Sequence, residues 1–170
     1  MLKEKVRKLV EEVDWSAWET AYGRADQEIP YYVQTGDGRG YMPKAAQSLL
    51  DLFSEDKEKA LQAAHDLWCG LCHQHSYVSS AALPAYDILM LALCSLNDEM
   101  KVELLDIFAG FAACTSEKDL HTGGWRGELR ERLETDRPVF QQLSRQENED
   151  VASFAELVLE YLDGTSKGQD

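Results

Sequence analysis

The sequence lacks any long apolar run. No stretch reaches the roughly 18 uncharged apolar residues that a membrane-spanning helix needs, and residues 1–13, MLKEKVRKLVEEV, lack the apolar centre of a signal peptide. We therefore expect a cytoplasmic protein that has no membrane partner. A cytoplasmic domain with a good core needs no disulfide framework. The four cysteines, which all stand in apolar helical segments, are expected to be reduced core thiols: Cys69, Cys72, Cys94 and Cys114.

Basic residues are scarce. The 170 residues include 17 Lys and Arg against 31 Asp and Glu, which gives a formal net charge of −14. A field of this sign repels phosphate backbones and anionic lipid, so nucleic acid and membranes are not expected as partners. A basic protein is the favoured partner class. Because 44% of the residues are hydrophobic, the chain has enough apolar side chain to bury a core, and the acidity does not predict disorder.

Strand signals are also missing. β-branched residues are scattered, and no run alternates polar and apolar residues over more than a few positions. Apolar residues recur instead at helical spacing along most of the chain, which predicts an all-α fold. Trp15, Trp18 and Tyr22 fall at i, i+3 and i+7, so they predict one aromatic side of a helix that ends at Gly23.

Three prolines divide the rest of the chain into similar units. Each proline opens or kinks an apolar helix, and an Asp or Asn begins another helix some twelve residues later. Repeats near 40 residues are typical of HEAT-type α-solenoids, so we expect antiparallel helix pairs stacked as a short HEAT-like α-solenoid. An irregular helical bundle is the alternative. The three units begin at Pro43 with Asp56, Pro84 with Asn97, and Pro138 with Asp150.

This pattern predicts one HEAT-like helical domain over residues 1–164, followed by a flexible tail over 165–170. Two glycine-containing segments interrupt the helical periodicity, and the longest loops are therefore expected at 34–43 and 117–126.

Motifs for catalysis are absent or incomplete. Cys69-Gly-Leu-Cys72-His73 has the spacing of a c-type haem attachment site, and His65 and His75 could complete a zinc shell, but all of these residues crowd onto one helix and its end. The glycines of residues 36–40 lack the Lys-Ser/Thr of a phosphate-binding loop, and Ser79-Ser80 lacks a nucleophile elbow. We expect no enzyme activity, no metal and no cofactor.

The arrangement of acidic residues is more informative. No basic residue occurs between Arg145 and Lys167, and four carboxylates of the last predicted helix lie away from its apolar side. A solvated outer face explains this pattern as well as a binding surface does. If the residues bind a partner, the candidates are Glu149, Glu156, Glu160 and Asp163, with Asp37 in the first glycine loop and Glu117 and Asp119 in the second as alternatives.

One ordered set of residues lies within the first 95 positions: Trp18, Tyr22, Gly23, Ala25, Ile29, Pro30, His73, Gln74, Tyr77, Ala81 and Pro84. Through these residues, this part of the chain resembles a family of bacterial HEAT-like repeat proteins. That family has a Trp-containing helix ending in Tyr-Gly-x-Ala, then Ile/Val-Pro, a helix rich in Ala and Leu, His-Gln-Gly, an aromatic residue and an Ala-x-x-Pro helix. Two departures are His75, where the family has glycine, and the insertion GDGRGYMP.

Members of this family are often encoded beside secreted toxins, and some look like immunity proteins of polymorphic toxin systems. The resemblance therefore implies a non-enzymatic inhibitor that neutralises a cognate toxin. Since many such toxins are basic nucleases, the acidity of this chain agrees with that implication. A general HEAT-like adaptor or scaffold is the alternative. In either case we expect His73 and Gln74 to stabilise a turn between helices.

Overall fold

The computed structural model describes residues 1–30 and 40–165, and most of these residues are helical. The all-α prediction is thus confirmed in outline. The α-helices are α1 (Leu2–Glu11), α2 (Ala45–Asp51), α3 (Lys57–Cys72), α4 (Ala82–Ser95), α5 (Asp98–Cys114), α6 (Glu117–Thr122), α7 (Gly124–Thr135), α8 (Arg137–Leu143) and α9 (Glu149–Asp163). The short elements are the 3-10 turns η1 (Trp15–Ala17) and η2 (His73–His75) and the strands β1 (Glu19–Thr20), β2 (Gly23–Arg24), β3 (Ile29–Pro30) and β4 (Tyr41–Met42).

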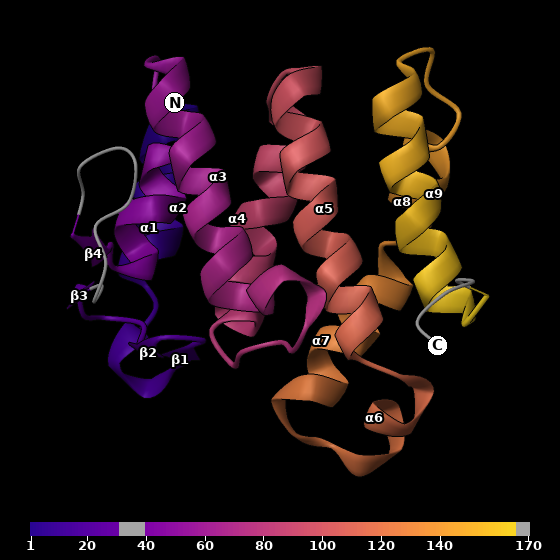
Figure 1. Cartoon of the computed structure of the whole chain (residues 1–170), viewed down its shortest axis with the longest axis horizontal. Helices are drawn as coiled ribbons and strands as arrows, with labels where there is room; N and C mark the ends of the chain where they lie inside the picture. The colour runs from indigo at the N-terminus through magenta and orange to yellow at the C-terminus, as the bar shows by residue number, and fades with distance from the viewer. Residues whose placement is uncertain (31–39, 166–170) are drawn as a thin grey trace.

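Three long helices lie side by side and form one layer of the molecule. Helix α5 is in the middle and packs against α3 on one side and α9 on the other (Figure 1). Behind this layer, α2 packs on α3, α4 on α5, and α8 on α9. Helix α1 lies against α2 and α4, while α7 fills the space next to α4, α5 and α8.

The three proline-led helix pairs are present as predicted. Pro43 precedes α2, Pro84 lies in the first turn of α4, and Pro138 is the second residue of α8. These are positions where proline costs no intrahelical hydrogen bond. The second helix of each pair is capped by a side-chain oxygen: Asp56 accepts from Lys59 N at 3.2 Å and Asn97 from Met100 N at 3.0 Å. In the third pair the prediction was wrong by two residues, because Asn148 rather than Asp150 caps α9.

Helix α5 is the centre of the core. Most of its side chains from Leu104 to Ala112 are buried, as expected for a helix with neighbours on several sides. The ring of Phe108 contacts three other rings, those of Tyr86, Phe111 and Phe140, at centroid distances of 5.3, 5.9 and 5.5 Å. Such aromatic packing joins α4, α5 and α8.

The helix predicted over residues 15–22 is not formed, and the expectation of no strands was wrong there. Asp14 does cap a turn, by accepting from Ser16 N at 3.1 Å, but only the 3-10 turn η1 follows. The backbone then bonds to distant elements: Glu19 N donates to Ser80 Oγ, and Ala21 N to the Gly70 carbonyl. These contacts replace the i to i+4 bonds of a helix, and β1 pairs with β2 in a short antiparallel hairpin.

The loop predicted at 117–126 is also wrong. Ser116 and Asp119 form a reciprocal capping box that begins α6, and only Gly123 separates α6 from α7. A side chain at Gly127 would meet the Asp119 carbonyl oxygen at 2.5 Å, so the two helices can approach only because this residue is glycine.

The remaining predictions for loops and ends are tested only in part. Of the predicted loop 34–43, residues 34–39 lie outside the described residues, while Tyr41 and Met42 form β4, which pairs with β3. Of the predicted tail, residues 166–170 lie outside the described residues, and Thr165 N donates to the Glu160 carbonyl at 2.9 Å, beyond a left-handed Gly164. In the part of the chain that the structure describes, every helix is too short or too polar to cross a bilayer.

Candidate protein-binding surface

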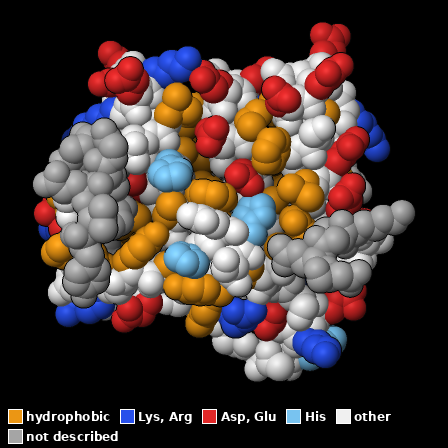
Figure 2. Space-filling model, viewed as in Figure 1, with side chains coloured by type: hydrophobic (Ala, Val, Ile, Leu, Met, Phe, Trp, Pro, Cys, Tyr) orange, Lys and Arg blue, Asp and Glu red, His pale blue; other side chains and the backbone are white. Residues whose placement is uncertain are grey.

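The four acidic candidates of the last helix share one side of α9. The buried residues Val151, Ala155, Val158 and Leu162 face the core. With 3.6 residues per turn, the acidic residues project from the opposite side, and all four are exposed. Figure 2 shows acidic side chains along the edge of the molecule over α9. The sequence prediction that these carboxylates lie away from the core is therefore confirmed for Glu149, Glu156, Glu160 and Asp163.

Ion pairing distinguishes Asp163 from the other three acidic residues. Asp163 accepts from Arg137 Nη1 at 2.7 Å, which offsets its charge within the protein. Glu149, Glu156 and Glu160 have no cationic side chain within 4 Å among the residues that the structure describes. We call these three residues the α9 carboxylates. Within the part of the chain that the structure describes, they present a row of carboxylates without ion pairs to solvent.

The alternative acidic candidates have different environments. Asp119 accepts from Ser116 N at 2.8 Å and pairs with Arg126 Nε at 3.2 Å. Although partial burial opposes the effect, these hydrogen bonds lower the pKa of Asp119. Its carboxylate therefore serves to cap α6. Glu117 is exposed in the first turn of α6, and Asp37 lies outside the described residues.

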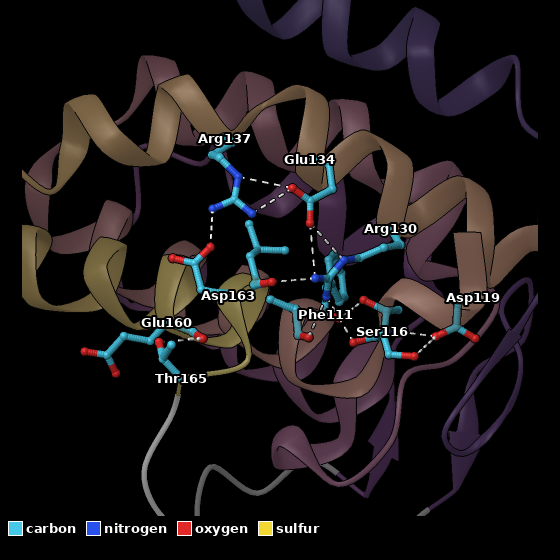
Figure 3. A network of polar contacts seen from close by, with 12 residues as sticks. Phe111, Ser116, Asp119, Arg130, Glu134, Arg137, Glu160, Asp163 and Thr165 are labelled. Atoms are coloured by element: carbon cyan, nitrogen blue, oxygen red, sulfur yellow. Dashed lines mark hydrogen bonds and ion pairs between the residues drawn. The ribbon is translucent and has the colours of Figure 1, made fainter. Parts of the chain in front are cut away.

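Beside α9, the fully buried guanidinium of Arg130 joins the ends of two helices. It donates to the carbonyl oxygens of Ala112 and Thr115 at the end of α5, at 3.4 and 3.1 Å, and to that of Leu162 at the end of α9, at 2.7 Å. Arg130 also pairs with Glu134, which in turn pairs with Arg137 (Figure 3). The helix ends carry partial negative charge, so a buried cation is stabilised there.

A hollow of about 640 Å³ opens next to this network, at the C-terminal ends of α5 and α9. Two of the acidic candidates, Glu117 and Asp163, line it together with Lys118, His75 and Tyr161. Glu149, at the other end of α9, is about 20 Å away along the helix axis. The described acidic candidates other than Asp119 thus lie at two sites: Glu117 and Asp163 line the hollow, and the α9 carboxylates lie on the outer side of α9.

The turn after α3 has an unusual backbone. His73, Gln74 and His75 have φ angles of 39, 56 and 64°, which places three successive non-glycine residues in the left-handed region. Each such residue costs of order 1 kcal/mol and persists only where the surroundings hold it. The turn lies directly on α5, because a side chain at Gly110 would meet Cys72 Sγ at 2.6 Å and His75 Cδ2 at 2.9 Å.

The side chain of His75 joins this turn to α5, while the expected stabilising roles of His73 and Gln74 stay predictions. His75 Nε2 lies 2.8 Å from the Asp106 carbonyl oxygen and 2.8 Å from its carboxylate. The hydrogen bond to Asp106 raises the pKa of His75 despite partial burial. His73 contacts aromatic rings instead, with Tyr77 at 5.0 Å and Tyr22 at 6.0 Å between centroids.

Four rings form a row that crosses from α3 to α9. The centroid distances are 5.7 Å from His65 to Trp68, 6.3 Å from Trp68 to His75, and 6.2 Å from His75 to Tyr161. We call these four residues the ring row. Figure 2 shows histidine and hydrophobic side chains gathered across the middle of the face that α3, α5 and α9 form. Sequence reasoning missed this row, because its members come from three separate elements.

The cysteine and histidine residues of the haem-like motif have other neighbours. The Cys69 Sγ lies 3.6 Å from His65 Nε2, and Cys72 Sγ donates to the Trp68 carbonyl at 3.3 Å. Within residues 1–30 and 40–165, no three His, Cys, Asp or Glu side chains are grouped for one metal ion. All four cysteines are free thiols, but Cys94 is exposed rather than in the core. Burial raises the pKa of Cys72 to about 12, so this thiol stays protonated.

No protein-family model, no curated protein and no solved structure matches the chain. The function must therefore be inferred from the chemistry of its surfaces. The most distinctive of these are the exposed α9 carboxylates and the face that carries the ring row.

Proposed function

We propose that this protein is a short HEAT-like α-solenoid that acts in the cytoplasm as a non-enzymatic inhibitor. It is an immunity protein that binds and neutralises a cognate bacterial toxin, a basic nuclease domain. The α-solenoid arrangement is supported by the three proline-led helix pairs and by the single layer that α3, α5 and α9 form.

The observation that carries the proposal is the row of α9 carboxylates. Glu149, Glu156 and Glu160 are exposed on one side of the outermost helix, and no described cation lies within 4 Å of them. A chain of net charge −14 with such an edge attracts a cationic surface before contact, which raises the association rate. A nuclease that binds phosphate backbones has a surface of that kind.

A non-enzymatic role agrees with the state of the reactive side chains. The imidazole of His75 is engaged by Asp106, and the guanidinium of Arg130 is used entirely within the fold. Full or partial burial raises the pKa of Cys72, Cys69 and Cys114, so these thiols are poor nucleophiles. The contacts of these groups within the fold support a role without catalysis.

The test is protection of a sensitive cell. The toxin domain encoded beside this chain is expressed alone, with the wild-type protein, and with the variant Glu149→Lys/Glu156→Lys/Glu160→Lys. We expect protection by the wild type and reduced protection by the triple variant. The matched control, Glu11→Lys/Glu128→Lys/Glu131→Lys, makes the same charge change at exposed carboxylates elsewhere and is expected to keep most of the protection.

Absence of protection by the wild type, together with absence of a complex between the purified proteins, contradicts the immunity function. The adaptor function then takes its place. If the two triple variants lose protection equally, overall charge rather than the α9 edge determines binding.

A further inference from the structure

The outward side of α5 carries a second set of carboxylates. Glu99, Glu103 and Asp106 stand at i, i+4 and i+7, so they project in one direction from the middle helix of the layer. Glu99 pairs with Lys57 Nζ at 2.9 Å, and Asp106 pairs with His75. Glu103 has no cation within 4 Å among the described residues. We call Glu99, Glu103 and Asp106, together with the ring row, the α5 face.

The surroundings of Glu103 are unfavourable for its negative charge. Partial burial removes water from its carboxylate, and Asp106 and Glu99 add repulsion, so the pKa of Glu103 is raised. The imidazole of His65 on α3 is close enough to offset a part of this. By contrast, hydrogen bonds from Arg24 lower the pKa of Asp26, and hydrogen bonds from Ser116 and Arg126 lower that of Asp119 despite its partial burial. A cation placed beside Glu103 would relieve this cost.

The ring row supplies the apolar part of the same face. His65 is exposed and Trp68 partly exposed on α3, and Tyr161 is partly exposed on α9. Aromatic rings next to carboxylates suit the long side chains of Arg and Lys, because the methylene groups lie along the rings while the charged end reaches the carboxylate. The hollow at the ends of α5 and α9 adjoins this face, since His75 and Tyr161 line it.

We propose that the α5 face binds a helical segment of the basic partner that carries arginines one turn apart. This inference rests on the proposed function and names where the partner is anchored, whereas the α9 carboxylates attract it from a distance. Charge complementarity selects this occupant: a second copy of the chain, at −14, and a phosphate-bearing ligand are both repelled. Arginines at i, i+4 and i+7 of such a helix match the spacing of the three α5 carboxylates. The middle arginine meets Glu103, while Glu99 and Asp106 also keep Lys57 and His75 as partners.

The probe is a fluorescein-labelled, alanine-based helical peptide of about 18 residues with arginines at i, i+4 and i+7, which is long enough to form a marginal helix. Binding to the full chain is followed by fluorescence anisotropy at low salt. The control peptide has the same composition with its arginines on different sides of the helix. We expect the first peptide to bind more tightly than the control.

The decisive variants change one residue each. Glu103→Gln is expected to weaken binding of the probe about fivefold, and Glu103→Arg more than tenfold. The matched control Glu131→Gln removes an exposed carboxylate of α7 and is expected to stay within about twofold of wild type. Because the surroundings of Glu103 disfavour its charge, unfolding curves should show Glu103→Gln to be at least as stable as wild type. Glu131→Gln, at an exposed carboxylate, should stay close to wild type.

Equal effects of Glu103→Gln and Glu131→Gln, or equal binding of the two peptides, overturn the inference. If the toxin is neutralised by wild type and by Glu103→Arg alike, the anchoring role of the α5 face is wrong while the proposed function stands. If the toxin is not bound at all but the probe still distinguishes Glu103 from Glu131, the proposed function fails and the cation-binding face remains.

Discussion

Arg130 donates a hydrogen bond to the carbonyl oxygen of Leu162 at 2.7 Å, and this contact ties α7 to the last turn of α9. The same guanidinium bonds to the end of α5 and to Glu134. A charge with only 2% of its residue surface exposed is tolerated because each part of the guanidinium has an acceptor. The end of the α5–α9 pair is therefore held by one side chain.

Replacement of Arg130 should destabilise the protein strongly. Arg130→Met leaves the carbonyls of Thr115 and Leu162 without this buried donor, while Glu134 keeps Arg137 as its partner. We expect a loss of about 3 kcal/mol or more in the free energy of unfolding. Urea denaturation measures it. Arg132→Met, which removes a surface ion pair with Asp87, is the control and should cost less than about 1 kcal/mol. Equal losses in the two variants would contradict the role of Arg130.

The contact between His75 and Asp106 should make stability depend on pH. Because the folded state raises the pKa of His75, the contribution is complete below the unfolded value of about 6.5 and is lost as the pH rises through the folded pKa. The difference in unfolding free energy between wild type and Asp106→Asn should therefore shrink as the pH rises from 6 to 8.5. His121→Gln, at an exposed histidine, should keep the wild-type profile. A difference that does not vary with pH refutes the linkage.

Two glycines inside helices should respond oppositely to alanine. At Gly110 a methyl group would lie 2.6 Å from Cys72 Sγ, and we expect Gly110→Ala to lose about 1–3 kcal/mol of stability. At Gly70 the nearest atom is Thr20 Cβ at 3.7 Å, an ordinary contact, so Gly70→Ala should gain up to about 1 kcal/mol from helix propensity. Thermal unfolding of both variants tests the pair. If Gly110→Ala were as stable as wild type, the turn at residues 73–75 would not be in close contact with α5.

The left-handed turn should be relieved by glycine. Gln74 is exposed with φ of 56°, and Gln74→Gly should raise the free energy of unfolding by about 0.5–1 kcal/mol, since glycine adopts this conformation without steric cost. Ser76, with φ of −81°, is the neighbouring control, and Ser76→Gly should lower stability. Chemical denaturation of the two variants decides the matter. The reverse order would mean that the Gln74 side chain stabilises the turn by more than its backbone costs.

Salt should slow the binding of a basic partner. Exposed charges are screened over about 8 Å at physiological ionic strength, so the association rate constant should fall steeply as salt increases while the dissociation rate constant changes much less. Stopped-flow mixing with the basic partner of the proposed function measures both constants. The triple variant at Glu149, Glu156 and Glu160 should show a weaker salt dependence than wild type. If the triple variant kept the salt dependence of wild type, the α9 carboxylates would have no role in attracting the partner.

The helix pairs could be predicted from sequence because their signals are local. A proline at a helix start or an Asp at an N-cap acts within one turn of the chain, as at Pro43 and Asp56. The segment that follows Asp14 could not be predicted in this way. Its backbone is bonded to Gly70 and Ser80, which are far away in sequence, and these contacts override the helical spacing of the tryptophans.

The candidate surfaces show the same limit. The common direction of Glu149, Glu156 and Glu160 follows from helical spacing alone and was predicted. The α5 face was not, because it depends on which helices lie beside α5 and on the turn at His75. One signal was present in the sequence: position 75, where the resembled pattern has glycine, adopts a φ of 64°, the region that glycine occupies most easily.

The outer side of α9 also bears on how copies of the protein meet one another. A stacked array of helix pairs can grow, or aggregate end to end, when its terminal helix offers an apolar side to the next unit. Here the side of α9 opposite the core carries Glu149, Glu156 and Glu160, which would be forced against another acidic molecule. Repulsion between like charges therefore disfavours self-association through this side of α9.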